Sequence, residues 1–301
     1  MSPVQKVIKY CAMALAITLI VSILTVITTI VSGIDKGINW DGKIDYININ
    51  HEFDDVQKLD ITNYSGKMFI QVGNVETIQV KAENVPDTTV IKMVDNETLY
   101  IDDTGSNTWF FNFSFLDNDR REESQITVTF PIDFKAKEVQ LDNNSGKMEL
   151  KGIYTERLVI SGGSGNIIGS NLKAEHVDLC VNSGDFELDN AYLSNGNIDG
   201  GSGAMLMTNS TLDNIEFDLG SGDLHLEGKL NGKNELNGGS GGILVNVSDS
   251  LDNYQLKLDA GSGDIWINGE RRNDEDIKNK DAENTLKIES GSGKVSINFA
   301  E

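Results

Sequence analysis

Residues 215–228 read IEFDLGSGDLHLEG, in which two strings of alternating apolar and polar residues meet at a Gly-Ser-Gly turn. Ser-Gly pairs begin at positions 145, 164, 183, 202, 221 and 240, so that five consecutive gaps are equal, and two more pairs begin at 262 and 292. A short fixed period of this kind is typical of a solenoid or another repeat array.

Apolar residues flank each Ser-Gly pair at fixed distances. Around Ser221 they are Ile215 and Phe217 before the turn and Leu224 and Leu226 after it. Alternation with a period of two predicts half-buried β-strands. So short a unit has no room for a crossover helix, and each strand should therefore pair in parallel with its equivalent in the next coil. The sequence predicts an all-β fold, a parallel β-solenoid (β-helix) of ~19-residue coils.

Glycine is expected at the turns for two reasons. It adopts positive φ readily, and it has no side chain that would crowd the same turn in the next coil. A flexible Gly/Ser linker would not carry apolar alternation on both sides at a constant register. Two insertions, around Ser248-Asp249-Ser250 and within residues 270–280, follow the second strand of their coils. They are expected at the corner opposite the Gly-Ser-Gly turns.

The first part of the chain follows the same design less regularly. Leu59 and Ile61 precede Ser65, and Met68 and Ile70 follow it. Further strands are expected around residues 78–80, 99–101 and 126–130. This pattern predicts three regions: a cytoplasmic tip and transmembrane anchor (1–34), irregular N-terminal β-solenoid coils (35–135) and regular Ser-Gly repeat coils (136–301).

Residues 10–31 form an apolar run of 22 residues without a charge, enough to cross a bilayer as one N-terminal transmembrane helix. Because Lys6 and Lys9 precede this run, the N-terminus is expected in the cytoplasm and the repeats outside the cell membrane. A cleaved signal peptide ending near Val31-Ser32-Gly33 is the alternative, although the run exceeds the ~7 to 15 apolar residues of a typical signal.

The chain has 25 Lys and Arg against 47 Asp and Glu, a net charge of −22. Without the first 31 residues the balance is 23 against 47, a net charge of −24. So acidic a protein is not expected to bind nucleic acid, and anionic lipid should repel its exported part. Cys11 and Cys180 are the two cysteines, too few for a disulfide framework or a thiolate metal site.

Two patterns resemble catalytic or metal motifs without fulfilling them. Gly238–Gly242 fits the G-x-S-x-G turn of hydrolases, but it is one turn of the repeat and no helix is expected after it. Asp185, Asp223 and Asp264 follow turns and resemble calcium-binding nonapeptide repeats of the form G-G-x-G-x-D, but in the turns GGSGNI, GGSGAM and GGSGGI the aspartate position of that motif is apolar. No catalytic, cofactor-binding or metal-binding residue and no cofactor is predicted.

The three histidines do not form a metal site in the sequence either. His51, His176 and His225 lack metal-ligand spacing, and His225 lies between two inward leucines and should face outward. The chain is therefore expected not to be an enzyme. Two alternatives remain open: a polysaccharide-acting β-helix enzyme that uses clustered carboxylates in a concave groove, and a passive stalk.

The most aromatic segment of the chain is residues 108–115, which read TWFFNFSF. Its rings at 109, 111, 113 and 115 share one face of a period-two string, and the ring at 110 lies on the other. They either close the core of an irregular coil or form an aromatic surface strip that contacts a glycan, a partner protein or the bilayer interface. The candidate partner contacts are Trp109, Phe110, Phe111, Phe113 and Phe115.

Three features together resemble a known family: an N-terminal anchor, strands ending in ITVTFPIDF (126–134), and VQLDNNSGKMEL (139–150) followed by serial Ser-Gly repeats. The chain is similar, over about residues 40–301, to the bacterial putative-adhesin family of membrane-anchored β-strand-repeat domains of unknown function. This resemblance implies a β-solenoid at the cell envelope that acts by binding, adhesion or scaffolding. Some relatives resemble proteins associated with envelope stress in Gram-positive bacteria. The family supplies no catalytic residues.

Overall fold

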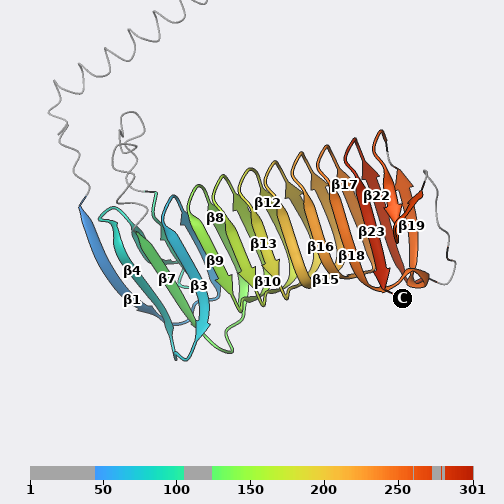
Figure 1. Cartoon of the computed structure of the whole chain (residues 1–301). Helices are drawn as coiled ribbons and strands as arrows, with labels where there is room; N and C mark the ends of the chain where they lie inside the picture. The colour runs from blue at the N-terminus through green and yellow to red at the C-terminus, as the bar shows by residue number, and fades with distance from the viewer. Residues whose placement is uncertain (1–44, 105–123, 260, 273–278, 280–281, 301) are drawn as a thin grey trace, which may run out of the picture. The chain divides into compact units, whose positions relative to one another are not determined.

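A computed structural model of the chain describes residues 45–104, 124–259, 261–272, 279 and 282–300. Residues 45–301 form one compact unit, separate from residues 1–44. This unit is all-β: in the described residues the one helical element is the 3-10 turn η2 (Leu251–Asn253). Figure 1 shows its strands side by side in a long, solenoid-like stack.

Two strand-bearing faces enclose the core. Face 1 consists, in spatial order, of β1 (Tyr46–Phe53), β4 (Ile78–Pro86), β7 (Gln125–Pro131), β3 (Lys67–Gly73), β9 (Lys147–Lys151), β11 (Ile167–Ser170), β13 (Phe186–Asp189), the first part of β15 (Met205–Leu219), β16 (Leu224–Asn231), β18 (Ile243–Ser250), β23 (Val295–Ala300), β20 (Ile265–Ile267) and β21 (Glu270–Arg272). Face 2 consists of β5 (Val90–Val94), β6 (Thr98–Asp102), β2 (Lys58–Asn63), β8 (Ala136–Asn143), β10 (Tyr154–Gly162), β12 (Lys173–Val181), β14 (Tyr192–Gly200), the second part of β15, β17 (Lys233–Gly238), β22 (Asn284–Ser290) and β19 (Tyr254–Asp259).

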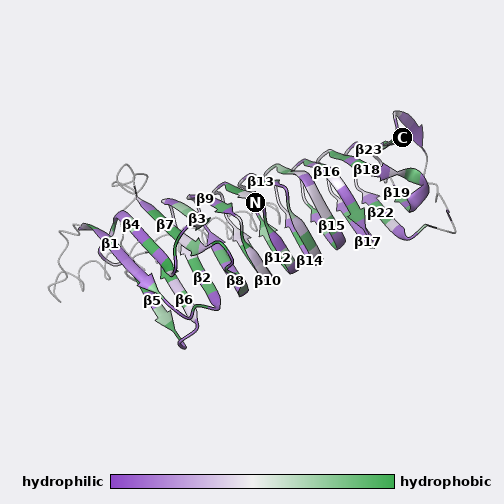
Figure 2. Cartoon of the chain, turned by 90° about the horizontal axis from the view of Figure 1, so that it is seen from below, coloured by the Kyte–Doolittle hydropathy of each residue, from purple (hydrophilic) through white to green (hydrophobic). Residues whose placement is uncertain are grey.

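The middle of the stack confirms the predicted parallel register. Leu158 pairs with Val177, which pairs in turn with Gly196, and each partner lies one repeat further along the chain. Alternate side chains point into one continuous core, in which Ile160, Leu179 and Ile198 are almost fully buried. Figure 2 shows the resulting alternation of hydrophobic and hydrophilic residues along the strands.

The regular Ser-Gly corners need glycine for only one of the two predicted reasons. None of Gly184, Gly203 and Gly222 has positive φ, so that part of the prediction is wrong for these corners, whereas Gly261 in the corner at 261–263 has a φ of 53° and confirms it there. Instead the corners of successive coils are so close that a Cβ on Gly222 would lie 2.0 Å from the carbonyl oxygen of Gly203. The absence of a side chain is therefore what allows these corners to stack.

Positive φ occurs at the opposite corner, where asparagine takes it. Asn171, Asn190 and Asn209 follow the face 1 strands of three successive coils, with φ of 54°, 53° and 50°. Asparagine tolerates this left-handed conformation better than most residues. The amide of Asn190 also donates to the side-chain oxygen of Asn171 at 2.6 Å, so this corner is held by a ladder of side chains.

The coils at the C-terminal end do not follow chain order, which the sequence did not predict. The strands β17 and β18 pair with β22 and β23, which come last in the chain, and β22 and β23 pair in turn with β19 and β20. The last coil in the sequence therefore lies between two earlier ones. Residues 248–250, the first predicted insertion, form the end of β18, where the register with β23 shifts between Val247 and Ser250. Of the second predicted insertion, residues 270–272 form β21, which pairs antiparallel with β20, and residues 273–278 and 280 lie outside the described residues.

The N-terminal end is also rearranged. The coil of β2 and β3 pairs with β8 and β9, although four strands come between them in the sequence, and on its other side it pairs with β6 and β7. The predicted strands near 78–80, 99–101 and 126–130 are present, but β4 pairs antiparallel with β7 and with β1. Neither β1 nor β5 was predicted. Within the described residues, no helix is long and apolar enough to cross a bilayer, and the predicted anchor at 10–31 lies outside them.

Candidate binding surfaces

The predicted aromatic contact, Trp109, Phe110, Phe111, Phe113 and Phe115, lies outside the described residues. The described chain before this segment ends at Thr104, just after β6 of face 2, and the described chain after it begins at Ser124, just before β7 of face 1. The carbonyl of buried Ser124 accepts the backbone N–H of Lys67 at 2.9 Å, beside the Ser65-Gly66 turn. Ser124 therefore lies directly against the Ser65-Gly66 corner, where a Cβ on Gly66 would be 2.2 Å from the Ser124 hydroxyl oxygen.

A groove of about 510 Å³ lies on face 2 where the long strands bend. Its lining comes from five strands and consists of Asn195, Gly196, Asn197, Asn214, Ile215, Glu216, Lys233, Asn234, Glu235, Lys257, Thr285 and Lys287. Gly196 faces inward here, and a Cβ on it would lie 1.8 Å from the Val177 carbonyl oxygen. Asn195 and Asn214, at φ of 50° and 57°, turn the backbone at this bend.

Most polar groups of the groove already have partners in the protein. Buried Asn234 accepts the N–H of Ile215 at 3.0 Å and donates to the Asn231 carbonyl at 2.7 Å. Lys287 lies 2.7 Å from Glu235 and 2.6 Å from Glu289, and its hydrogen bond to Glu235 above all raises the pKa of the lysine. These side chains therefore hold neighbouring strands together at the groove.

The groove also bears on the enzymatic alternative. Glu216 and Glu235 are register neighbours on the parallel strands β15 and β17, and a carbohydrate-cleaving enzyme uses a pair of carboxyl groups. Glu235, however, forms the ion pair with Lys287. The described residues contain no group of three or more His, Cys, Asp or Glu that could hold a metal ion.

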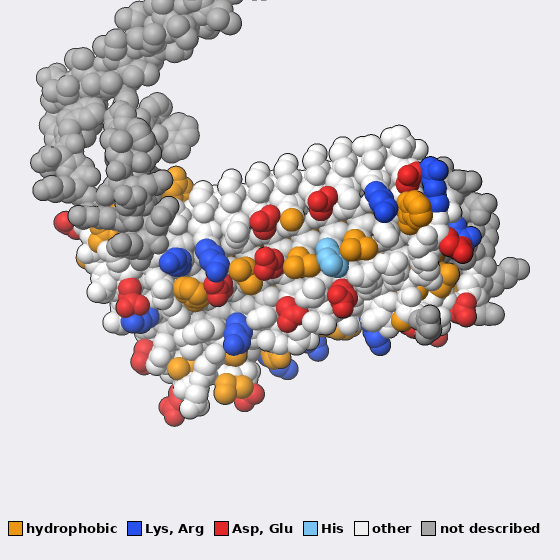
Figure 3. All heavy atoms as spheres, in the orientation of Figure 1, with side chains coloured by type: hydrophobic (Ala, Val, Ile, Leu, Met, Phe, Trp, Pro, Cys, Tyr) orange, Lys and Arg blue, Asp and Glu red, His pale blue; other side chains and the backbone are white. Residues whose placement is uncertain are grey.

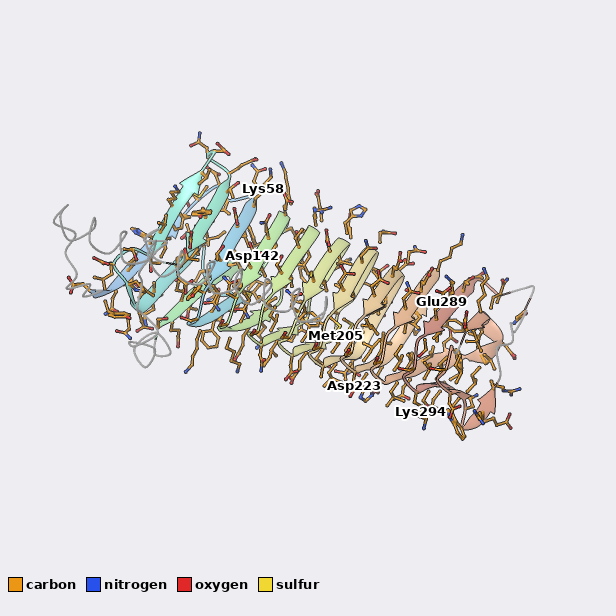
Figure 4. The ribbon with its side chains drawn as sticks, turned by 90° about the horizontal axis from the view of Figure 1, so that it is seen from above. Lys58, Asp142, Met205, Asp223, Glu289 and Lys294 are labelled. Atoms are coloured by element: carbon orange, nitrogen blue, oxygen red, sulfur yellow. The ribbon has the colours of Figure 1, made fainter. Side chains whose placement is uncertain are left out.

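Acidic side chains occupy one outward column of face 2. The column runs through Asp102, Thr62, Asp142, Ser161, Cys180, Asp199, Asp218, Asn237, Glu289 and Asp259. Figure 4 labels Asp142 and Glu289 on this face, whereas the labelled Asp223 and Lys294 directly precede the face 1 strands β16 and β23. Burial and then the nearby carboxylates of Asp218 and Asp178 raise the pKa of Asp199, so the charged form of this side chain is disfavoured in the column.

The aspartates that resemble calcium ligands have structural partners instead. Asp185 accepts the backbone N–H of Ala204 at 3.0 Å, and Asp223 accepts that of Gly242 at 2.7 Å. Each side chain thus satisfies a donor in the following coil. Asp264 pairs with Arg271.

The three histidines and the serine of the hydrolase-like turn lie on different strands or corners of the solenoid. His51 lies on β1, His176 on face 2, and His225 on face 1, where it is half-buried and outward as predicted. Ser240, the centre of the G-x-S-x-G pattern, donates its backbone N–H to the Gly220 carbonyl at 3.0 Å, and β18 follows it rather than a helix. The structure therefore does not bring these residues together.

Several solved structures resemble this chain. One is a putative adhesin from Bacteroides fragilis NCTC 9343, with 12% identity over 85% of this chain and 97% of that one and a TM-score of 0.43. Another is a putative adhesin from Parabacteroides merdae ATCC 43184, with 12% identity, 87% and 98% coverage and a TM-score of 0.43. A third is described as a putative lipid binding protein, from Parabacteroides distasonis ATCC 8503, with 17% identity, 85% and 97% coverage and a TM-score of 0.42.

The comparison with curated proteins gave no match. The family comparison did, and it confirms the resemblance seen in the sequence. Residues 56–298, which include nearly all of the described solenoid, match the family described as Toastrack DUF4097. This chain is therefore a member of the Toastrack DUF4097 family.

Proposed function

We propose that the protein is a membrane-anchored binding or adhesion module that displays its solenoid at the outer side of the cell membrane. The observation that carries the proposal is the uninterrupted parallel register between coils, which forms long, straight columns of outward side chains. Such columns suit an extended partner, because they repeat one contact at a fixed interval. The resemblance of the sequence to the putative-adhesin family implies the same function.

The anchored location rests on the sequence. Residues 10–31 supply the membrane span, and Lys6 and Lys9 supply the orientation. The acidic exported part keeps the solenoid away from anionic lipid and soluble in the envelope. A role in the response to envelope stress would follow if partner binding by the solenoid changed with the state of the envelope.

The proposal is tested by co-sedimentation of residues 45–301 with isolated cell envelopes. We expect retention, and we expect the double variant Trp109→Ala/Phe110→Ala to lose it if the aromatic segment makes the contact. Tyr192→Ala is the matched control, because Tyr192 is an aromatic residue that is 39% exposed on a regular coil. Its retention should equal that of the unmodified protein, and both variants should keep the thermal midpoint.

The alternatives give different results in the same assay. A passive stalk would not sediment with envelopes at all, which would refute the proposal. A polysaccharide-acting enzyme would release soluble reducing sugar from the envelopes, and Glu216→Gln would abolish that release. A large loss of stability in the Trp109→Ala/Phe110→Ala variant would assign these rings to the core.

A further inference from the structure

The central outward column of face 1 alternates between apolar and polar residues from one coil to the next. In spatial order it reads Phe69, Glu149, Ile168, Glu187, Leu206, His225, Leu244, Ser296 and Trp266. We call these nine residues the alternating row. Figure 3 shows hydrophobic side chains in a broken line along this face, separated by acidic side chains and a histidine.

The alternation is a property of the folded order of the coils. If the coils stacked in the order of the chain, Trp266 would lie next to Leu244, and two apolar members of the row would be adjacent. In the structure β23 lies between β18 and β20, so that Ser296 separates them. At the other end, Phe69 of β3 pairs with Glu149 of β9, which belongs to a much later coil in the sequence. Both rearranged ends of the solenoid therefore continue the row.

Stability of the fold does not explain this pattern. Neighbouring strands lie about 4.8 Å apart, so apolar side chains on adjacent rungs would contact and bury one another. Placing Glu187 between Ile168 and Leu206 prevents that contact. The five apolar members are all half-buried, and the ammonium group of Lys294 lies 5.1 Å over the ring of Trp266.

The row therefore presents an apolar contact at every second coil, a repeat of about 10 Å. This is nearly the length of one disaccharide in an extended β-1,4-linked glycan. In such a chain each sugar is rotated by half a turn relative to the next, so identical ring faces recur once per disaccharide. From Phe69 to Trp266 the row spans nine coils, about 38 Å, or four such repeats.

The neighbouring columns suit the edges of a sugar chain. On one side of the row the column contains Lys151, Ser170, Asp189, Thr208, Glu227, Asn246 and Asn298. The Thr208 hydroxyl donates to Asp189 at 2.9 Å, and Asn246 accepts from Asn298 at 2.9 Å and lies 3.5 Å from His225. Polar side chains of this column can form hydrogen bonds with sugar hydroxyls while the apolar members of the row contact the faces of the sugar rings. Because the chain has a net charge of −22, a neutral polymer fits better than a polyanion.

We propose that the alternating row binds a linear, uncharged β-1,4-linked polysaccharide that lies along the solenoid axis, with one disaccharide for every two coils. This inference rests on the proposed function and names the ligand class of the binding module. The apolar faces of alternate sugars contact Ile168, Leu206 and Leu244. The polar members of the row form hydrogen bonds with the sugars in between.

The test is calorimetric titration of residues 45–301 with cello- and chito-oligosaccharides, from disaccharide to decasaccharide. We expect at least one series to bind, with affinity rising for each added disaccharide until the row is filled. Malto-oligosaccharides of equal length are the control, because α-1,4 linkages curl the chain. Absence of binding by both β-1,4 series, or affinity that does not depend on length, would overturn the proposal.

Two variants separate the row from the rest of the surface. Leu206→Ser/Leu244→Ser should weaken binding by at least tenfold, because two apolar contacts are lost. Val159→Ser is the matched control, since Val159 is a half-buried outward residue on face 2, and its affinity should not change. Equal affinity of the two variants would also overturn the proposal. Outward substitutions of this kind leave the core intact, which the thermal midpoint verifies.

The outcomes also separate this proposal from the proposed function. If the unmodified protein sediments with envelopes and Leu206→Ser/Leu244→Ser sediments equally, the row is not the contact but the binding function stands. If the oligosaccharides bind and envelopes do not retain the protein, the row stands and the envelope function fails. Concentration-dependent dimerisation that the same double variant abolishes would make a second copy of this chain the occupant and overturn the glycan proposal.

Discussion

The Gly-Ser-Gly corners predict a large and specific effect of a single methyl group. In Gly222→Ala the new Cβ would lie 2.0 Å from the carbonyl oxygen of Gly203 and 3.0 Å from its carbonyl carbon. Both atoms belong to the backbone of the preceding coil, so no side chain can rotate away to make room. The two corners must separate by more than about 1 Å before the contact becomes an ordinary one.

Separation of the corners weakens the hydrogen bonds between them. Ser221 and Gly222 both donate their N–H groups to the Gly201 carbonyl, at 2.9 Å and 3.0 Å. Loss of two such bonds costs about 1 kcal/mol each, and overpacking adds about 1 to 3 kcal/mol. The expected loss of unfolding free energy is about 3 to 5 kcal/mol, which lowers the melting temperature by about 10 °C in a domain of this size.

Thermal unfolding followed by circular dichroism measures this effect on residues 45–301. The matched control is Gly242→Ala, because the nearest atom to its Cβ is a side-chain oxygen of Asp223 at 3.4 Å and its φ is not positive. That variant should melt within about 2 °C of the unmodified protein. If Gly222→Ala and Gly242→Ala melt together, close stacking of the corners is not what requires glycine.

Two further stability predictions concern the asparagine corner and the acidic column. Asn209→Gly should be tolerated, whereas Asn209→Val should lower the melting temperature by several degrees, because valine disfavours the φ of 50° found there; equal melting of the two variants would contradict this. Asp199→Asn should raise the melting temperature at neutral pH, because the pKa of Asp199 is raised in the folded state and its charged form therefore destabilises the fold. This gain should shrink as the pH falls from neutral towards the ordinary aspartate pKa of about 3.9, and a gain that grows on acidification would refute a raised pKa of Asp199.

Much of the fold was predictable because the determining interactions are local to one coil. Alternation around each Ser-Gly pair defines which side chains are buried, and the short, constant period leaves parallel stacking as the way to pair the strands. The same reasoning gave the outward direction of His225 and the absence of a hydrolase-type helix after Ser240. The sequence could also have indicated the asparagine corner, since Asn171, Asn190 and Asn209 recur with the same period as the Ser-Gly pairs.

The candidate sites could not be predicted from the sequence in the same way. The groove at Gly196 and the alternating row both consist of residues that look ordinary within their own coils. Leu206, for example, is one apolar residue at an outward position of a strand, and single exposed apolar residues are common. Its significance comes from Glu187 and His225 on the two adjacent coils and from the repetition of that arrangement along face 1.

The sequence by itself therefore determined the coil: its length, its two strands, its inward residues and its glycine corner. Only the tertiary structure decided the order in which the coils stack, with β22 and β23 placed between earlier coils and β2 and β3 placed next to β8 and β9. The physical reason is that every coil offers similar rows of backbone N–H and C=O groups on both of its edges, so alternation within a coil cannot specify its neighbour. That choice depends on how the ends of the whole stack are covered, and it also creates the alternating row.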